Sequence, residues 1–123
     1  MTDEEQIRQL TARYNLAFDT RDVESFVACF TEDCTFLFVT SGRRLNGHAD
    51  MRNAIETVVN EGRHHTTDFI VEVDGDRATQ RCQLIELGTF DDFAVVRRFG
   101  RYFDELVRID GAWRFRSREL TYG

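Results

Sequence analysis

Two adjacent histidines, His64 and His65, are the side chains of this 123-residue protein best suited to acid–base chemistry near neutral pH. They stand in the segment RHHTTDF, at the start of an expected strand. Successive strand residues point to opposite faces of a sheet, so at most one of the two can face the interior. A neutral imidazole there can remove a proton from a carbon beside a carbonyl group.

The apolar pattern of the strand and the geometry of strand entrances favour different histidines. Alternation of Phe69, Val71 and Val73 places His65 on the apolar face and His64 on the opposite one. A bulge near the strand entrance would exchange these two orientations. The spacing of the residues therefore leaves both histidines open.

An acid that could hold the imidazole, Asp19, ends a predicted helix over residues 3–19. The apolar stripe of this helix contains Ile7, Leu10, Tyr14 and Phe18. Asp19 lies roughly 100° around an ideal helix from Phe18, at the edge of the stripe. Because the C-terminal end of a helix carries partial negative charge, a carboxylate there indicates a cationic or hydrogen-donating partner. We predict that a histidine is this partner.

Tyr14 and Asp22 lie near Asp19 and have different expected roles. The Tyr14 hydroxyl could donate a hydrogen bond to a carbonyl oxygen or a departing hydroxyl, although Tyr14 could equally be a packed core aromatic. Asp22 precedes the second apolar repeat, which contains Val23, Phe26, Val27 and Phe30. We expect Asp22 to cap this second helix and to take no part in catalysis.

The remaining elements change from helical to strand-like spacing near the middle of the chain. A short strand, CTFLFV from Cys34, and the turn SGRRLNG precede a third helix, which is marked by Met51, Ile55, Val58 and Val59 and ends near Gly62. Four strands then follow in antiparallel succession. The third of them, RRFGRYFDELVRI, has a possible bulge at Gly100, and Asp110-Gly111 predicts a two-residue hairpin turn.

This order predicts one α+β domain over residues 1–123, with three helices covering one face of a strongly curved antiparallel sheet. A curved sheet cannot lie flat on its helices. A cone-shaped space therefore remains between them, closed at one end by packed Phe side chains and open to a small ligand at the other.

Composition and charge exclude several classes of partner. The formal net charge is −6 and the basic residues are scattered from Arg8 to Arg118, which argues against nucleic acid. An acidic N-terminus and the lack of a long apolar run indicate a cytoplasmic protein with no membrane partner. The cysteines Cys29, Cys34 and Cys82 have no metal-ligand spacing, and adjacent strand histidines cannot share one ion. We expect neither a metal nor a cofactor.

Four segments of the chain resemble, in order, the SnoaL-like branch of the nuclear transport factor 2-like superfamily. They are YNLAFDTRDVESFVACFTEDCTF, NGHADMRNAI, HHTTDFIVEVDGDRA and GRYFDELVRIDGAWRFRSREL. The resemblance covers nearly the whole chain and implies a cone-shaped α+β barrel. The resemblance indicates the fold more closely than the function. Members of the superfamily include dehydratases, a dehydrochlorinase, polyketide cyclases, isomerases and proteins without catalytic activity.

The resemblance also implies roles for particular residues. The dehydratase and dehydrochlorinase members carry a pocket His–Asp pair, which corresponds to His64 and Asp19 here, and Tyr14 falls where they carry a polar pocket residue. Arg118 matches a pocket arginine of the dehydrochlorinase. Strand alternation, however, places Arg118 on the solvated face unless the strand bulges near Ser117.

One dehydratase feature is missing from this sequence. Scytalone dehydratase carries a second pocket histidine on the next strand, whereas the comparable stretch here, ATQRCQLIEL, has Arg81, Cys82 and Gln83 and no residue that replaces it. A carboxylate in the middle of the sheet would instead suggest a ketosteroid-isomerase-like enzyme, with Asp104 and Glu105 as the candidates.

The resulting functional hypothesis is a cofactor-independent lyase, a dehydratase or cyclase, acting on a small apolar or aromatic oxygenated molecule. The alternatives are a non-catalytic binding or assembly domain, similar to the small subunit of ring-hydroxylating dioxygenases, and a ketosteroid-isomerase-like isomerase. An open cavity with an imidazole on its wall would favour a lyase over an assembly domain. We also expect a homodimer through the sheet face, where Arg97, Arg98, Arg101 and Arg108 alternate with Phe99, Phe103 and Val107.

Overall fold

The computed structural model describes residues 1–58 and 62–123. Its helices are α1 (Asp3–Thr20), α2 (Val23–Ala28) and α3 (Gly47–Thr57). Its strands are β1 (Phe30–Phe38), β2 (Arg43–Asn46), β3 (Arg63–Asp74), β4 (Arg77–Phe90), β5 (Phe93–Ile109) and β6 (Ala112–Tyr122). The predicted α+β class is confirmed, and helix α1 begins at the predicted residue.

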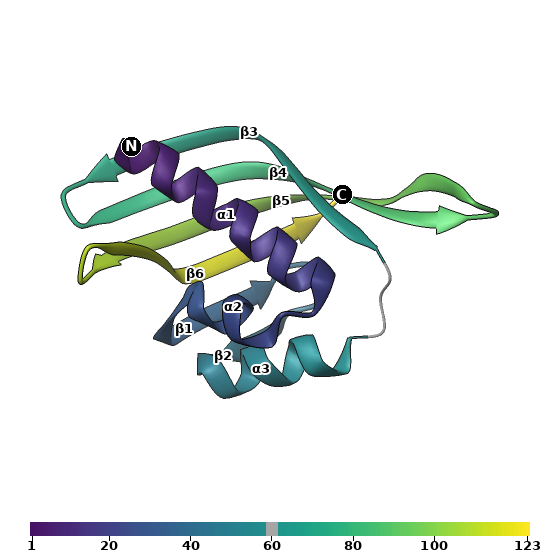
Figure 1. The fold of residues 1–123 in the computed structure, drawn as a ribbon, viewed down its shortest axis with the longest axis horizontal. Coiled ribbons are helices and arrows are strands. Elements are labelled where there is room, and N and C mark those ends of the chain that lie inside the picture. Colours follow the sequence, from purple (N-terminus) through teal and green to yellow (C-terminus); the bar gives the residue numbers. More distant parts are fainter. Residues whose placement is uncertain (59–61) are drawn as a thin grey trace.

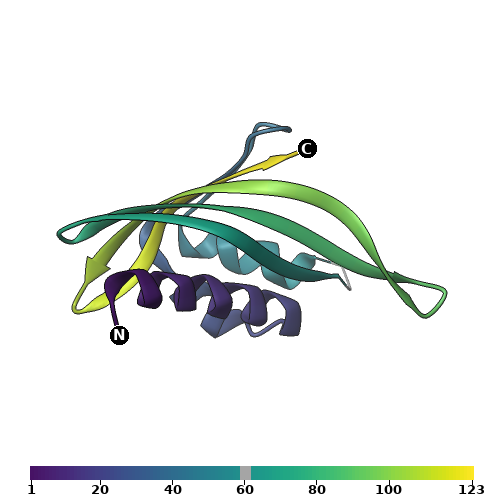
Figure 2. The ribbon, with the colours of Figure 1, turned by 90° about the horizontal axis from the view of Figure 1, so that it is seen from above.

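The strands form one curved sheet in the order β2-β1-β6-β5-β4-β3 (Figure 1). Neighbouring strands pair antiparallel except β1 and β6, which run parallel, so the sheet is not wholly antiparallel as expected. Figure 2 shows the helices on the concave side of this sheet. No helix of the described residues is long and apolar enough to cross a membrane.

Local sequence explains where the helices begin and end. Thr2 and Glu5 form a capping box at the start of α1, and Arg21 ends the helix in a left-handed conformation. Asp22 caps α2 as predicted, because its carboxylate accepts hydrogen bonds from the backbone and the hydroxyl of Ser25. Helix α3 ends earlier than predicted, with Val58 already extended, and Val59 lies outside the described residues.

Two strand boundaries differ from the prediction. Strand β1 begins at Phe30 rather than at Cys34, because its first residues run beside Phe115 of β6. The segment expected to be wholly a turn contains β2, which pairs with β1. The Asp110-Gly111 turn is confirmed: both residues have positive φ angles, as a tight two-residue hairpin requires.

Bulges decide which side chains face the interior of the sheet. In β3 an extra residue lies between Thr67 and Ile70, where Asp68 has a φ of 58°. In β6 the extra residue is Arg116, and in β5 it is Arg97 rather than the predicted Gly100. Each bulge reverses the parity of the residues beyond it, so simple alternation fails at these strand segments.

The bulge in β6 turns Arg118 into the core, where its side chain is fully buried. Its Nε lies 2.7 Å from Oδ1 of Asp104, and its Nη2 donates to Oδ2 at 3.2 Å. Gln80 donates to the same Asp104 oxygen and to the Thr11 hydroxyl. The solvated position expected for Arg118 is therefore wrong, because the extra residue shifts it to the inner face.

Removing one partner of this buried ion pair should destabilise the fold strongly. Arg118→Met leaves the Asp104 carboxylate buried without its counter-charge, so we expect a loss of about 3–5 kcal/mol in the free energy of unfolding. The double variant Arg118→Met/Asp104→Leu removes both charges and should recover much of this loss. Urea denaturation measures both, and a double variant as unstable as the sum of the two single variants would contradict the prediction.

Candidate active site

An open cavity of about 490 Å³ lies between α1 and the concave face of the sheet. Its apolar wall is formed by Phe18, Phe36, Phe38, Val58 and Leu120. The polar side chains that face it include Tyr14, His64, Glu86, Arg98, Tyr102 and Tyr122. A mostly apolar cavity with a few converging polar groups is typical of small-molecule sites, and its volume suits a ligand of one or a few rings.

His64 lies on the wall of this cavity. Asp19 does not line the cavity and contacts His64 from behind, where the end of α1 lies against the start of β3. His64 Nδ1 is 2.8 Å from Asp19 Oδ1. The backbone N–H of His64 also donates to the same carboxylate, at 3.2 and 3.1 Å from its two oxygens. An ionised carboxylate only accepts hydrogen bonds, so the neutral form of His64 carries its proton on Nδ1 and presents the lone pair of Nε2 toward the cavity.

The bulge at Asp68 explains which histidine faces in. From Phe69 onward the apolar residues alternate as predicted, but the extra residue shifts the earlier part of the strand by one position. His64 is consequently buried, whereas His65 is exposed and pairs with Ile85 outside the cavity. The orientation of His65 expected from alternation alone is wrong.

Tyr14 lines the cavity, whereas Arg118 lies in the core behind it. Tyr14 lines the cavity, and burial raises its pKa to about 12 against the opposing charge of Arg118, so its hydroxyl remains a hydrogen-bond donor at neutral pH. Arg118 is not among the described residues that line the cavity. The guanidinium of Arg118 lies 4.5 Å from the centre of the Tyr14 ring and 3.6 Å from the centre of the Tyr102 ring. It packs against both rings through cation–π contacts.

Glu86 is the cavity residue that the sequence reasoning missed. It lies on β4 directly across from His64 in the register of the two strands, and its side chain is almost completely buried. Oε1 of Glu86 is 3.9 Å from Nε2 of His64. Glu86 belongs to the stretch ATQRCQLIEL, but its place opposite His64 depends on the register between β3 and β4, which no sequence pattern indicates.

The carboxylates expected for an isomerase do not face the cavity. Asp104 is paired with Arg118 in the core, and Glu105 is exposed on the other face of β5. Among the described residues, no group of three or more His, Cys, Asp or Glu side chains is arranged to bind a metal ion. The polar groups that line the cavity are suited to proton transfer and hydrogen bonding.

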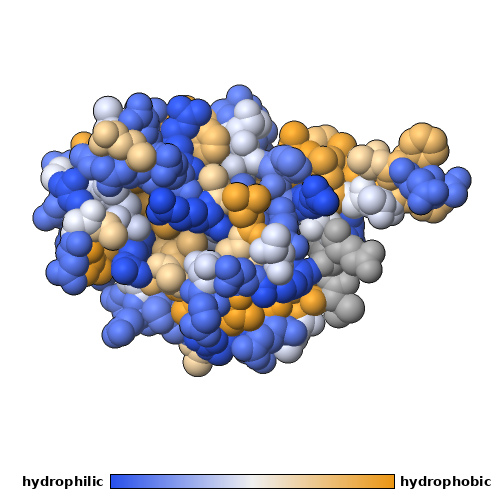
Figure 3. Space-filling view, in the orientation of Figure 1, coloured by the Kyte–Doolittle hydropathy of each residue, from blue (hydrophilic) through white to orange (hydrophobic). Residues whose placement is uncertain are grey.

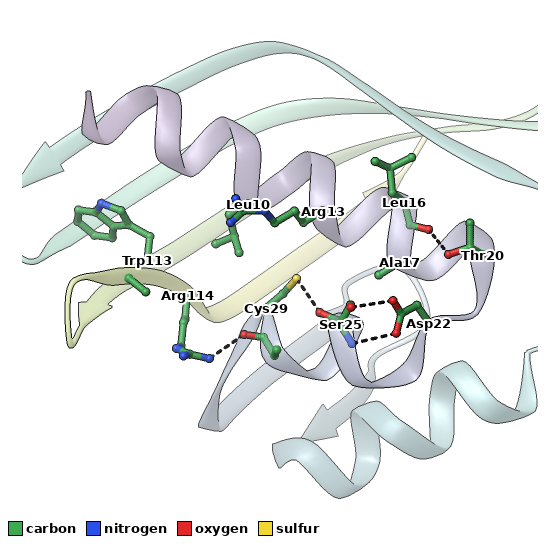
Figure 4. A pocket seen from close by; sticks show the side chains of 12 residues that line it. Leu10, Arg13, Leu16, Ala17, Thr20, Asp22, Ser25, Cys29, Trp113 and Arg114 are labelled. Atoms are coloured by element: carbon green, nitrogen blue, oxygen red, sulfur yellow. Dashed lines mark hydrogen bonds between the residues drawn. The ribbon is translucent and has the colours of Figure 1, made fainter. Parts of the chain in front are cut away.

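A second hollow, of about 470 Å³, lies outside the barrel between α1, α2 and the start of β6 (Figure 4). Three of its titratable side chains make hydrogen bonds that belong to the fold. Asp22 caps α2, Cys29 donates through Sγ to the Ser25 carbonyl, and Arg114 donates to the Ala28 carbonyl. Burial raises the pKa of Cys29 to about 11, which leaves its thiol unreactive at neutral pH.

The chain belongs to the SnoaL-like domain family, whose model matches residues 1–119. No curated protein matches the sequence significantly. Among solved structures, Rv3472 of Mycobacterium tuberculosis, a protein of unknown function, is 36% identical with a TM-score of 0.91, over 98% of this chain and 72% of that one.

Two proteins of Novosphingobium aromaticivorans are also similar. A proposed aromatic ring hydroxylase is 31% identical with a TM-score of 0.85, over 98% of this chain and 88% of that one. A proposed scytalone dehydratase is 24% identical with a TM-score of 0.84, over 98% and 84% of the two chains. The second likeness establishes a shared fold and nothing more.

The Asp19 carboxylate should fix the tautomer of His64. In Asp19→Asn the amide group can donate to Nδ1, so we expect a larger share of neutral His64 to carry its proton on Nε2. Long-range proton–nitrogen NMR correlations distinguish the two tautomers. Asp22→Asn is the matched control, because Asn caps a helix about as well as Asp. An unchanged tautomer in Asp19→Asn, or the same change in Asp22→Asn, would contradict the pairing.

Proposed function

We propose that the protein is a cofactor-independent lyase, a dehydratase or cyclase, that uses His64 as its general base. The observation that carries this proposal is the 2.8 Å contact of Asp19 Oδ1 with Nδ1 of His64, a residue that lines an open and mostly apolar cavity. An imidazole held in this way keeps a basic Nε2 facing bound substrate. Asp19 stabilises the imidazolium that forms when the proton is taken.

The substrate best suited to this cavity is a small oxygenated ring compound, such as a polyketide, a terpenoid or an aromatic catabolite. Stacked and edge-on aromatic side chains provide apolar walls for a ring. The protonated hydroxyl of Tyr14 can donate to a carbonyl oxygen of the substrate, where negative charge develops once a proton leaves the adjacent carbon.

Two observations favour this proposal over the alternatives. The cavity is open. In a purely structural assembly domain, Phe side chains could fill this space. Neither Asp104 nor Glu105 faces it, so the two carboxylates considered for an isomerase are not placed to act. Glu86, the carboxylate that does face it, is held by hydrogen bonds from Arg98 and Tyr122. Similarity to a proposed scytalone dehydratase is compatible with a lyase, and similarity to a proposed aromatic ring hydroxylase is compatible with an aromatic ligand.

A screen of hydroxylated ring ketones for elimination or cyclisation tests the proposed activity. We expect His64→Gln and Asp19→Asn to reduce kcat/KM by roughly 100-fold or more, since general acid–base catalysis contributes about that much. His65→Gln is the matched control and should change kcat/KM by less than about twofold, because His65 lies outside the cavity. Equal effects of the two histidine substitutions, or saturable binding without turnover, would reject the lyase in favour of a binding domain.

We further propose that two copies associate through the convex face of the sheet. Phe99 and Ile70 are 60% and 59% exposed there. Two of the expected arginines take other positions: Arg98 turns to Glu86 in the cavity, and Arg108 binds Asp3 and Asp76. The face is therefore less positively charged than the sequence pattern indicated.

Sedimentation velocity at micromolar concentration tests this association. We expect a dimer for the wild type and a shift toward monomer for Phe99→Asp, since a charge at the centre of an apolar contact is costly to bury. Arg44→Asp, an exposed change on β2, should leave the dimer intact. A wild type that sediments as a 14.4 kDa monomer would reject the proposal.

A further inference from the structure

Glu86 places a negative charge on the cavity wall opposite the reactive nitrogen of His64. Only 3% of the residue is exposed. Its Oε2 accepts a hydrogen bond from Arg98 Nε at 2.9 Å, and its Oε1 accepts one from the Tyr122 hydroxyl at 3.2 Å. A buried carboxylate without partners would be strongly unfavourable, so these two donors are what keep Glu86 in place.

Arg98 and Tyr122 also fix the direction in which Glu86 points. The Arg98 guanidinium lies 4.0 Å from the centre of the Tyr122 ring, and this cation–π contact holds the two donors next to each other. Burial and the nearby Glu86 charge raise the pKa of Tyr122 to about 12, which keeps its hydroxyl protonated and donating. Each carboxylate oxygen has two lone pairs, and one on Oε1 remains available to a ligand.

The 3.9 Å separation between Glu86 Oε1 and His64 Nε2 is too long for a hydrogen bond. It is wide enough for one ligand oxygen to lie within about 2.8 Å of both atoms. A hydroxyl group suits this position, because it donates its hydrogen to Glu86 and its oxygen can accept the proton that Nε2 carries once His64 has become an imidazolium. A halogen or a carboxylate has no hydrogen to donate and would meet the buried negative charge directly.

From this arrangement we infer that Glu86 is a specificity-determining residue that selects substrates whose leaving group is a hydroxyl. The inference rests on the proposed lyase activity and restricts it to dehydration. The fold alone does not impose this restriction, because it also supports the removal of other leaving groups. The substrate is then an uncharged ring compound with a hydroxyl on the carbon β to its carbonyl group.

The reaction balances with the residues present. His64 Nε2 takes the proton from the carbon next to the carbonyl group, and the electron pair of that C–H bond forms the new double bond. As the C–O bond breaks, the imidazolium returns the same proton to the departing oxygen. Water and the unsaturated ketone leave, and His64 is neutral again. Glu86 accepts a hydrogen bond from the departing water as positive charge develops on its oxygen.

Matched pairs of ring ketones that carry either a hydroxyl or a chlorine on the same β carbon test this inference. Binding is measured by NMR titration and turnover by product formation, in wild type, Glu86→Gln and Glu119→Gln. Glu119 is an exposed glutamate on the neighbouring part of the sheet and serves as the control. Tyr122→Phe, which removes one donor to Glu86 and little volume, is a second test variant in case Glu86→Gln does not fold.

Wild type and Glu119→Gln should bind the hydroxyl compound about tenfold to hundredfold more tightly than the chlorine compound, the effect of one hydrogen bond to a charged group. Glu86→Gln should bring this ratio close to one, and Tyr122→Phe should lower it. An unchanged ratio in Glu86→Gln, or no preference in the wild type, would overturn the inference. A preference that depends on Glu86 without turnover of either compound would instead reject the lyase and retain the selectivity.

Discussion

The carboxylate of Asp19 joins the last turn of α1 to the first residues of β3, and the geometry of the cavity depends on this junction. It accepts a hydrogen bond from the His64 ring and another from the His64 backbone. The side-chain bond orients the imidazole, and the backbone bond fixes where the strand begins relative to the helix. A carboxylate at a helix C-terminus is unfavourable by itself, and these donors compensate for that position.

The floor of the cavity depends on a second buried interaction. The Arg118–Asp104 pair lies beneath Tyr14 and Tyr102, and its guanidinium packs on both rings. Such a pair contributes little net stability compared with apolar residues of the same size, but it is very sensitive to the loss of one partner. Its packing on both rings fixes the orientation of the two tyrosines that line the cavity.

The fold and part of the site could be predicted from the sequence because helical and strand periodicity report burial directly. Asp19 was identified from the family resemblance together with its place at the edge of the α1 stripe, and Asp22 from its place before α2. The burial of His64 and Arg118 depends on bulges at Asp68 and Arg116. Each bulge inserts one extra residue, which reverses the face of the sheet toward which the neighbouring side chains point. Glu86 could not be found because its partners Arg98 and Tyr122 come from β5 and β6, and their meeting depends on strand register.

Hydrogen–deuterium exchange measures the proposed removal of a proton from carbon by Nε2 of His64 without requiring a leaving group. A ring ketone that fits the cavity is incubated with the protein in D2O, and loss of the proton signal beside its carbonyl group is followed by NMR. Wild type should accelerate this loss well above the uncatalysed rate, and His64→Ala should abolish the acceleration. Exchange at the uncatalysed rate while the ketone saturates the wild-type cavity would contradict the account.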